Sequence, residues 1–224
     1  MRIRRKKHLE ERKDAVGDIL LTADFDIKNA LEAIKDKRYY NLALIFGNDN
    51  PICMEIGCGK GLFVCETAKR NPSVNYVAVE LLDNIIVMAC ERCKRYQLGN
   101  VRFFNCGADY LPRYIADNTL SKLYLNFSPP FPGDRYENRR LTCDRLMEYY
   151  NKMLKYDGEI HLKTDDKGFF DYSYEQMIKH GYMVKIEDVQ NIQTDEDYVK
   201  TEYEIKFNKE NKPIYKMIAK KLSN

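Results

Sequence analysis

The sequence predicts an α/β fold in which a mostly parallel sheet carries helices on both faces. Short apolar segments alternate with longer segments of helical periodicity, which is the pattern of right-handed β-α-β units. The composition supports it: 44% of the 224 residues are hydrophobic and 32% are charged. A chain of this kind is globular and long enough to bury a full core.

The first half of the chain sets up the alternation. Residues 27–34 (IKNALEAI) have helical spacing with Asp26 as the expected N-cap. A short apolar strand follows at 52–56 (ICMEI), and a helix at 62–70 is stopped by Asn71-Pro72. The next strand is expected at 75–81 and the next helix at 83–97, before Gly99.

The second half continues in the same way. Strands are expected at 101–106, 122–127 and 159–164, and a long amphipathic helix at 138–156 is closed by Asp157-Gly158. A helix at 167–179, a strand after Gly181 and a final pair of elements around 199–207 and 214–220 complete the prediction.

Charge is unevenly distributed along the chain. The 37 Lys and Arg and 34 Asp and Glu sum to +3. Residues 1–13 hold seven basic and two acidic side chains and carry +5, so the other 211 residues sum to 3 − 5 = −2. We therefore expect a basic N-terminal arm (1–26) that contacts a nucleic-acid backbone, and a single domain over 27–224.

Several classes of protein are disfavoured by composition. No apolar run reaches the length of a membrane span and no secretory signal is recognisable, so we expect a cytoplasmic protein with no membrane partner. The seven cysteines lie mostly in apolar runs, as reduced thiols do. Cys90 and Cys93 have no second pair to complete a zinc site, so we expect them to be structural and the protein to need no metal.

A glycine-rich turn follows the strand at 52–56. Gly57 and Gly59 allow a ligand to lie against bare backbone at a helix start. The dinucleotide fingerprint would need glycine where Leu62 stands, and the phosphate-loop motif fails because Lys60 is followed by Gly61. A dinucleotide-dependent reductase is therefore disfavoured.

Carboxylates stand at the ends of three successive strands. Glu55 ends the first, Glu80 the second, and Asp109 follows the third. Such positions meet where ligands bind in open α/β sheets. Glu80 can accept from a ribose, Asp109 from an adenine amine, and the negative charge suits a cationic ligand without phosphate. This combination points to S-adenosylmethionine.

The segment after residue 126 suits RNA. Three prolines stiffen 128–132, Phe127 and Phe131 can stack on a base, and Arg135, Arg139 and Arg140 can hold phosphates. Arginines near a helix start oppose its dipole, so an anion is expected beside them.

Eight ordered segments resemble the tRNA (guanine-N7)-methyltransferase family: MRIRRK, FGNDNP, EIGCGKG, NPSVNYVAVE, LYLNFSPPFP, RRLT, HLKTDD, and TEYEIKF with PIY. The resemblance implies a Rossmann-like class I methyltransferase fold and formation of 7-methylguanosine, at the tRNA variable loop in this family. For the cofactor it implies Glu55, Glu80 and Asp109, and we expect Gly57 and Gly59 of the glycine-rich turn and Pro129 to contact the cofactor as well. For tRNA it implies Gly133, Arg135, Arg139, Arg140, Asp165, Thr201, Glu202, Tyr203 and Glu204.

The chain departs from the family motif NFSDPWPK at the position usually assigned to catalysis, which is Pro129 here. Guanine N7 carries a lone pair and no hydrogen, so its methylation needs no general base and depends on positioning and electrostatics. Asp165 and Asp134 are the remaining candidates for a catalytic carboxylate. We therefore expect an active but altered enzyme.

Two alternatives stay open at this stage. Residues 128–131 (SPPF) look like the motif of methyltransferases that act on exocyclic amines of bases. The Pro129 departure also allows a tRNA-binding relative without catalysis. The nature of the methylated nucleoside, if any forms, separates these alternatives.

Overall fold

The computed structural model describes residues 8–23, 29–189, 198–210 and 212–222. Its strands are β1 (Leu20–Thr22), β2 (Ile52–Ile56), β3 (Asn75–Val79), β4 (Val101–Asn105), β5 (Leu120–Asn126), β6 (Leu154–Thr164), β7 (Tyr182–Glu187) and β8 (Tyr215–Lys221). They form one eight-stranded sheet in the order β1-β4-β3-β2-β5-β6-β8-β7.

The sheet is parallel from β1 through β6, and only β8 runs antiparallel, to both β6 and β7. Chain order reverses at the centre, because β2 leads to β3 and β4 on one side and lies beside β5 on the other. This is the topological switch point, where open α/β sheets bind their ligands at the carboxyl ends of the strands.

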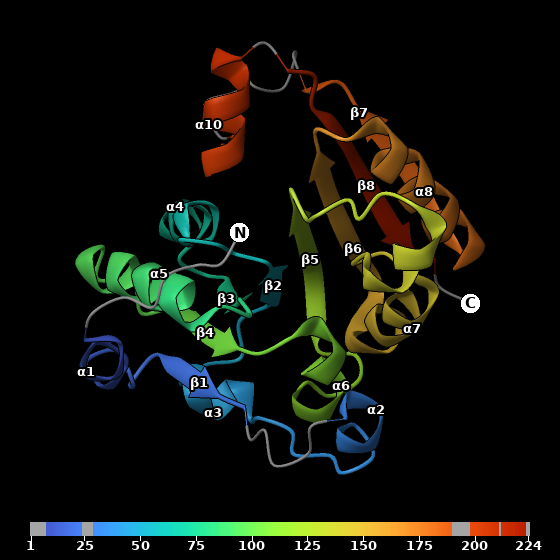
Figure 1. Cartoon of the computed structure of the whole chain (residues 1–224). Helices are drawn as coiled ribbons and strands as arrows, with labels where there is room; N and C mark the ends of the chain where they lie inside the picture. The colour runs from blue at the N-terminus through green and yellow to red at the C-terminus, as the bar shows by residue number, and fades with distance from the viewer. Residues whose placement is uncertain (1–7, 24–28, 190–197, 211, 223–224) are drawn as a thin grey trace.

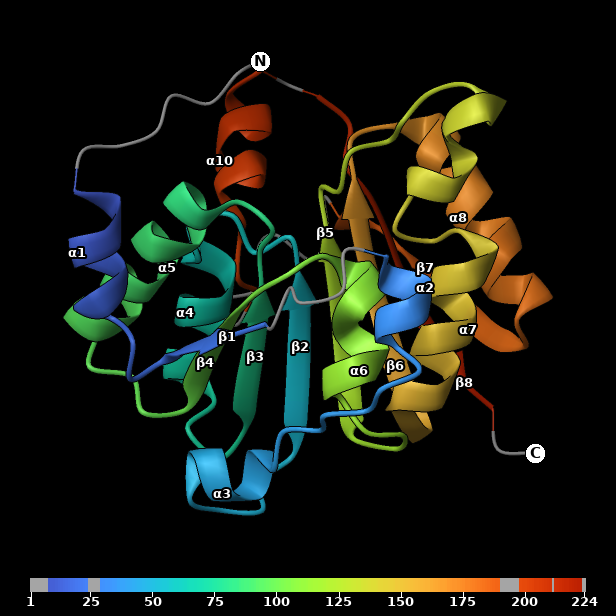
Figure 2. The same cartoon turned by 60° about the horizontal axis from the view of Figure 1, so that its bottom comes forward.

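The helices are α1 (Leu9–Asp14), α2 (Ala30–Ala33), α3 (Leu42–Phe46), α4 (Leu62–Arg70), α5 (Asp83–Arg95), α6 (Leu111–Tyr114), α7 (Asp144–Met153), α8 (Lys167–Lys179) and α10 (Glu202–Lys209), with 3₁₀ turns η1 (Ala108–Tyr110) and η2 (Asp134–Arg139). Helices α1, α4 and α5 lie on one face of the sheet, and α6, α7 and α8 on the other (Figures 1 and 2). Helix α10 stands apart from both layers, beyond the carboxyl ends of the central strands.

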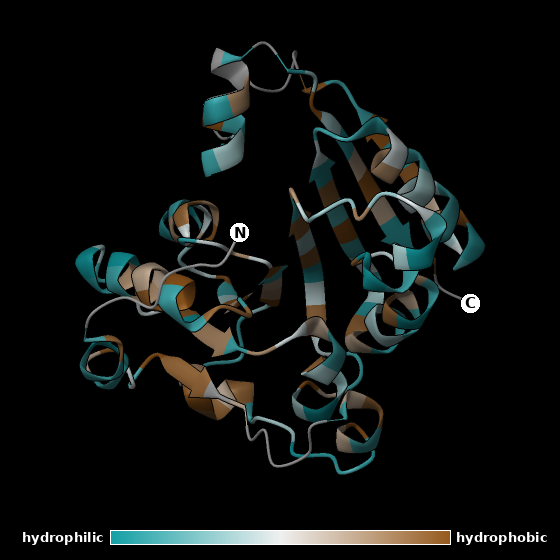
Figure 3. Ribbon diagram, viewed as in Figure 1, coloured by the Kyte–Doolittle hydropathy of each residue, from teal (hydrophilic) through white to brown (hydrophobic). Residues whose placement is uncertain are grey.

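The core lies on both faces of the central strands. Every residue of β2 and β3 is buried, because helices cover these strands from two sides. The apolar residues concentrate on the strands and the inner helix faces, while the outer faces are hydrophilic (Figure 3). The predicted α/β class with a mostly parallel sheet and helices on both faces is therefore confirmed.

The prediction of a long helix at 138–156 is wrong at both ends. Residues 138–139 belong to η2, α7 covers only Asp144–Met153, and β6 begins at Leu154. Leu154 pairs with Leu120 of β5 and is fully buried. A buried leucine fits a helix and a strand equally well, so periodicity alone could not find this boundary.

The expected basic arm is partly built into the domain. Leu9, Val16, Ile19 and Leu20 are buried, and β1 pairs in parallel with β4. Arg12 makes a bidentate ion pair with Glu91 of α5, with both N–O distances 2.7 Å. Residues 8–23 of the arm are therefore packed structure, and residues 1–7 and 24–26 lie outside the described residues.

All seven cysteines are free and buried, and Cys90 and Cys93 pack in the core from the buried face of α5. Within the described ranges, no group of His, Cys, Asp and Glu side chains has the arrangement of a metal site. No helix in these ranges is both long and apolar enough to span a bilayer.

Candidate active site

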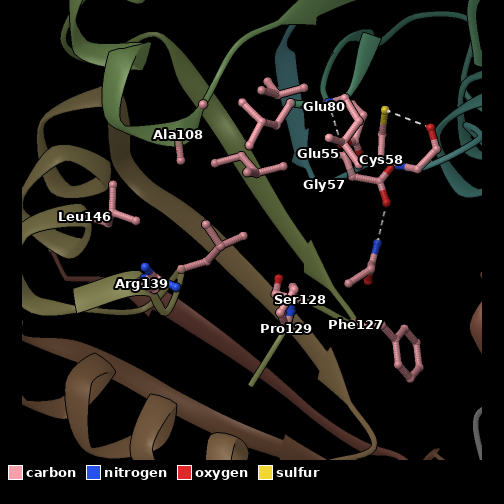
Figure 4. A pocket seen from close by; sticks show the side chains of 18 of the residues that line it. Glu55, Gly57, Cys58, Glu80, Ala108, Phe127, Ser128, Pro129, Arg139 and Leu146 are labelled. Atoms are coloured by element: carbon pink, nitrogen blue, oxygen red, sulfur yellow. Dashed lines mark hydrogen bonds between the residues drawn. The ribbon is translucent and has the colours of Figure 1, made fainter. Parts of the chain in front are cut away.

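A cavity of about 700 Å³ opens at the carboxyl ends of β2, β3, β4 and β5. It lies at the switch point between β2 and β5, where the sequence analysis expects the ligand. Figure 4 shows Glu55 and Glu80 on one side of it, Ala108 and Leu146 on the other, and Ser128 and Pro129 at its edge. The cavity is a pocket of the size that binds a cofactor.

The glycine-rich turn forms one wall of this cavity. Gly57, Gly59 and Gly61 have φ angles of 80°, 56° and 75°, a region that favours glycine. A Cβ on Gly61 would lie 2.8 Å from the Cβ of Ala89 on α5. Glycine at position 61 therefore serves both the backbone conformation and the close packing of α4 on α5.

Glu55 is a buried carboxylate at the end of β2. Its Oε1 accepts a hydrogen bond of 2.9 Å from Asn126 Nδ2 at the end of β5. Its Oε2 has no partner among the described residues. Burial raises the pKa of Glu55 to about 7, against the lowering effects of Asn126 and Lys163. A cationic ligand would favour the ionised form.

Two further acidic side chains line the same cavity. Glu80 Oε2 accepts from the Gly59 amide at 3.2 Å, and its Oε1 accepts from the Leu82 amide at 3.0 Å. Glu80 therefore braces the glycine-rich turn. Asp109, on η1, forms an ion pair with Arg145 of α7, and both side chains face the cavity.

The loop after β5 carries backbone strain. Phe127 and Phe131 have φ angles of 52° and 44°, which are unusual for aromatic residues. The Phe127 amide donates to Lys163 O at 2.8 Å. Between them, Ser128 is buried with an unpartnered hydroxyl, and Pro129 is exposed at the cavity edge.

The arginines of this region divide into two groups. Arg140 donates to Phe131 O from Nε and Nη2, both at 3.3 Å, and its guanidinium lies 4.3 Å from the Tyr172 ring centre. It therefore holds the loop. Arg135 and Arg139 are exposed and lie 4.5 and 5.3 Å from the ring centre of Tyr136.

The structure gathers ten of the expected site residues around one cavity: Glu55, Gly57, Gly59, Glu80, Asp109, Pro129, Arg139, Thr201, Glu202 and Tyr203. Six others do not line it: Gly133, Asp134, Arg135, Arg140, Asp165 and Glu204. Asp134 is exposed on η2, Asp165 is half-buried after β6, and Glu204 is completely buried.

Among the lining residues that the sequence analysis missed, Asn126 and Arg145 contact expected site residues, Glu55 and Asp109. Asn126 is the last residue of β5, and a polar residue at the end of a buried strand was a usable signal. Arg145 lies within the amphipathic pattern of α7, where nothing distinguished it from an exposed arginine.

Three of the buried polar atoms that lack partners belong to residues that line the cavity. Besides Glu55 Oε2, they include Asn126 Oδ1 and Ser128 Oγ, all buried and all from residues that line it. Buried polar atoms are nearly always hydrogen-bonded, so three atoms without partners at one cavity indicate a ligand that supplies hydrogen-bond donors. Together with the acidic side chains, they suit a cationic ligand with amine and hydroxyl groups.

Comparison with known proteins identifies the family. Residues 49–217 match the model of a family described as "Putative methyltransferase". A tRNA (guanine-N(7)-)-methyltransferase of Alkaliphilus oremlandii is 38% identical over 206 residues, which cover 87% of this chain and 97% of that protein. Proteins of the same name from Bacillus subtilis and Clostridioides difficile are 38% and 36% identical to this chain. The first match covers 86% of this chain and 92% of that protein, and the second covers 99% of each.

Solved structures with the same fold are more distant in sequence. The 16S rRNA methyltransferase KamB has a TM-score of 0.62 at 9% identity, with 84% of this chain and 96% of that one covered. Precorrin-6y C5,15-methyltransferase from Geobacter metallireducens has a TM-score of 0.55 at 18% identity, with 91% and 95% covered. These likenesses establish the Rossmann-like class I methyltransferase fold. On the sequence matches, which span nearly its whole length, the chain belongs to the tRNA (guanine-N(7)-)-methyltransferase family.

Proposed function

We propose that this protein transfers the methyl group of S-adenosylmethionine to N7 of a guanine in tRNA, at the variable-loop position that the family resemblance implies. The observation that carries the proposal is the cavity at the switch point, lined by Glu55, Glu80 and Asp109 in a chain of this family. The amine-methylating and non-catalytic alternatives are not favoured by relatives that share one name and about 40% identity.

The residues present fit the cofactor. Glu55 Oε2 and Asn126 Oδ1 are buried acceptors without partners, and they suit an ammonium group. Glu80 stands at the end of β3, where an acidic side chain can accept from ribose hydroxyls. The carboxylate of Asp109 forms an ion pair with Arg145 and also faces the cavity. It is therefore available to accept a hydrogen bond from an adenine amine.

The chain's own contribution to the reaction is positioning and charge. The cofactor supplies a methyl group on a positively charged sulfur, and its transfer forms the N7–C bond as the S–C bond breaks. N7 carries no hydrogen, so no side chain has to remove a proton. The buried carboxylate of Glu55 and the acidic side chains that line the cavity favour a cationic ligand there.

Asp165 and Asp134 remain our candidates for a carboxylate that accepts from the guanine edge. Neither lines the cavity: Asp134 begins η2, after the loop that borders it, and Asp165 follows β6, the strand beside β5. Arg135 and Arg139, exposed around Tyr136, are proposed to hold the tRNA backbone.

The test is incubation with labelled S-adenosylmethionine and bulk unmodified tRNA, followed by nucleoside analysis. We expect 7-methylguanosine as the labelled product. N-methylated adenine or cytosine would support the amine-methylating alternative, and no labelled nucleoside at saturating cofactor would support the non-catalytic one.

A further inference from the structure

The start of helix α10 covers part of the cavity. Thr201, Glu202 and Tyr203, at its start, line the cavity, although the helix belongs to neither layer around the sheet (Figure 1). A short helix that stands apart needs specific anchors to keep one position.

The strongest anchor is Glu204, which is completely buried. Its Oε2 accepts from the Thr201 amide at 2.7 Å and from Lys163 Nζ at 3.2 Å. Its Oε1 is bonded to the Tyr198 hydroxyl and lies 3.4 Å from Lys163 Nζ. In return, the Glu204 amide donates to Thr201 Oγ1 at 3.0 Å, which completes a capping box.

Both oxygens of Glu204 are therefore occupied inside the protein. An RNA group could bond to this carboxylate only by displacing the protein's own donors, and the side chain has no exposed surface. The family resemblance alone suggested a tRNA contact here, whereas the geometry suggests a different role.

Lys163, the partner of Glu204, connects α10 to the floor of the site. Its side chain is 5% exposed, and it lies 4.1 Å from the ring centre of Tyr198 and 5.3 Å from that of Phe63. On the sheet it is the register partner of Asn126, whose amide bonds to Glu55. The ion pair therefore joins the helix above the cavity to the strand ends that form its base.

The position of α10 also affects the strained loop. Tyr203 stacks on Phe127 with ring centres 5.8 Å apart and planes at 20°, and Phe207 lies 5.7 Å from Phe127. Phe127 directly precedes Ser128 and Pro129 at the cavity edge. A displaced α10 would release the aromatic contact that supports Phe127 in its unusual conformation.

We infer that Lys163 and Glu204 are positioning residues: their buried ion pair fixes α10 over the cavity, and Glu204 serves methylation through this pair without touching tRNA. The inference deepens the proposed function and rests on it for its activity readout. A buried pair of this kind tolerates joint replacement by neutral residues much better than the loss of one partner, which leaves an unpaired buried charge.

The experiment is a double-mutant cycle with Lys163→Met, Glu204→Gln and the double variant. We expect each single change to raise the KM for tRNA or lower kcat by roughly ten-fold or more, with the cofactor Kd within about three-fold of the wild type. The double variant should recover to within about three-fold of the wild type. Glu210→Gln, the same change at an exposed position after α10, is the matched control and should have no effect.

A direct tRNA contact by Glu204 predicts the opposite pattern. The double variant would then be no better than Glu204→Gln, and this result would overturn the inference. Hydrogen exchange of the amides of 201–209, measured without tRNA, provides a second readout: it should accelerate in each single variant and slow again in the double variant. Unchanged exchange in the single variants would also overturn the inference, whereas absence of 7-methylguanosine with the wild-type protein would overturn only the proposed function.

Discussion

The charge of the Glu55 carboxylate is unfavourable for folding and favourable for binding a cationic cofactor. Its carboxylate is buried among strand ends, with one oxygen bonded to Asn126 and the other without a partner among the described residues, and burial penalises the charged form. The same charge is what a cationic cofactor would require. Binding residues are often unfavourable for the stability of the ligand-free protein for this reason.

The raised pKa of Glu55 predicts a pH dependence of stability. Because its pKa rises from 4.5 to about 7 on folding, the folded state binds this proton more tightly, and the associated stability is lost as pH rises through about 7. Without cofactor, Glu55→Gln should therefore exceed the wild type by about 2 kcal/mol in free energy of unfolding at pH 8, with a smaller difference at pH 5.5. Denaturant unfolding at both pH values measures this.

Cofactor titration of the same variant supplies the control. Glu55→Gln should bind S-adenosylmethionine at least about ten-fold more weakly at pH 8, since it lacks the charge. A variant that is less stable than the wild type at both pH values, or that binds the cofactor as tightly, would contradict our account of Glu55.

Pro129 occupies the position at which the family usually has Asp. Because it is exposed at the cavity edge, an aspartate there can be accommodated without burying an unpaired charge. Pro129→Asp should raise kcat by roughly ten-fold, through acceptance from the guanine edge and stabilisation of the incoming positive charge. Steady-state kinetics measure this, with Pro132→Asp in the same loop as the matched control. If Pro129→Asp is no faster, a carboxylate at this position has no catalytic role in this chain.

At the scale of elements, the close packing of α4 on α5 depends on Gly61 of the glycine-rich turn. Gly61→Ala would place a methyl group 2.8 Å from the Cβ of Ala89 and put alanine at a φ of 75°. We expect a loss of about 2–4 kcal/mol in free energy of unfolding, measured with denaturant. Gly99→Ala, where a Cβ meets nothing within 4 Å, should change it by less than about 0.5 kcal/mol.

A coupled variant separates the two causes. Ala89→Gly removes the contacting carbon, so it should reduce the cost of Gly61→Ala in the double variant below the sum of the two single costs. Strict additivity would show that backbone strain alone, rather than the helix–helix contact, requires glycine at position 61.

Elements with a single dominant signal were predictable from the sequence. β2, α4 and α8 have the expected bounds, because each is a continuous pattern of one periodicity between clear breakers. β1 was missed because three residues carry too little periodicity, and its pairing with β4 comes from distant residues. The start of β6 was missed because Leu154 is buried in either conformation.

At the scale of the whole molecule, the site was predictable where chain order determines geometry. Glu55, Glu80 and Asp109 were expected to meet because the carboxyl ends of parallel strands share one edge. The burial of Glu204 and its pairing with Lys163 could not be predicted, because the partners lie 41 residues apart and are joined only by folding. A family motif says which residues recur and not which atoms they contact.

The charge distribution also belongs to the whole molecule. Arg12 and Lys13 of the expected arm are paired with Glu91 and Asp83 on α5, so the basic side chains at 2–7 are the ones we assign to RNA. Replacing these five Arg and Lys residues by Gln should weaken tRNA binding and reduce the slope of log Kd against log salt by at least about one. Cofactor affinity and unfolding temperature should not change, and an equal loss of cofactor affinity would indicate a role in folding.

The central claim is that this cavity methylates N7 of guanine in tRNA. Its most direct measurement is nucleoside analysis of unmodified tRNA after incubation with the wild-type protein and labelled S-adenosylmethionine, with Glu55→Gln as the parallel reaction. The account predicts labelled 7-methylguanosine that is strongly reduced with the variant. A labelled nucleoside methylated on an exocyclic amine, or no labelled nucleoside at all at saturating cofactor, would contradict it.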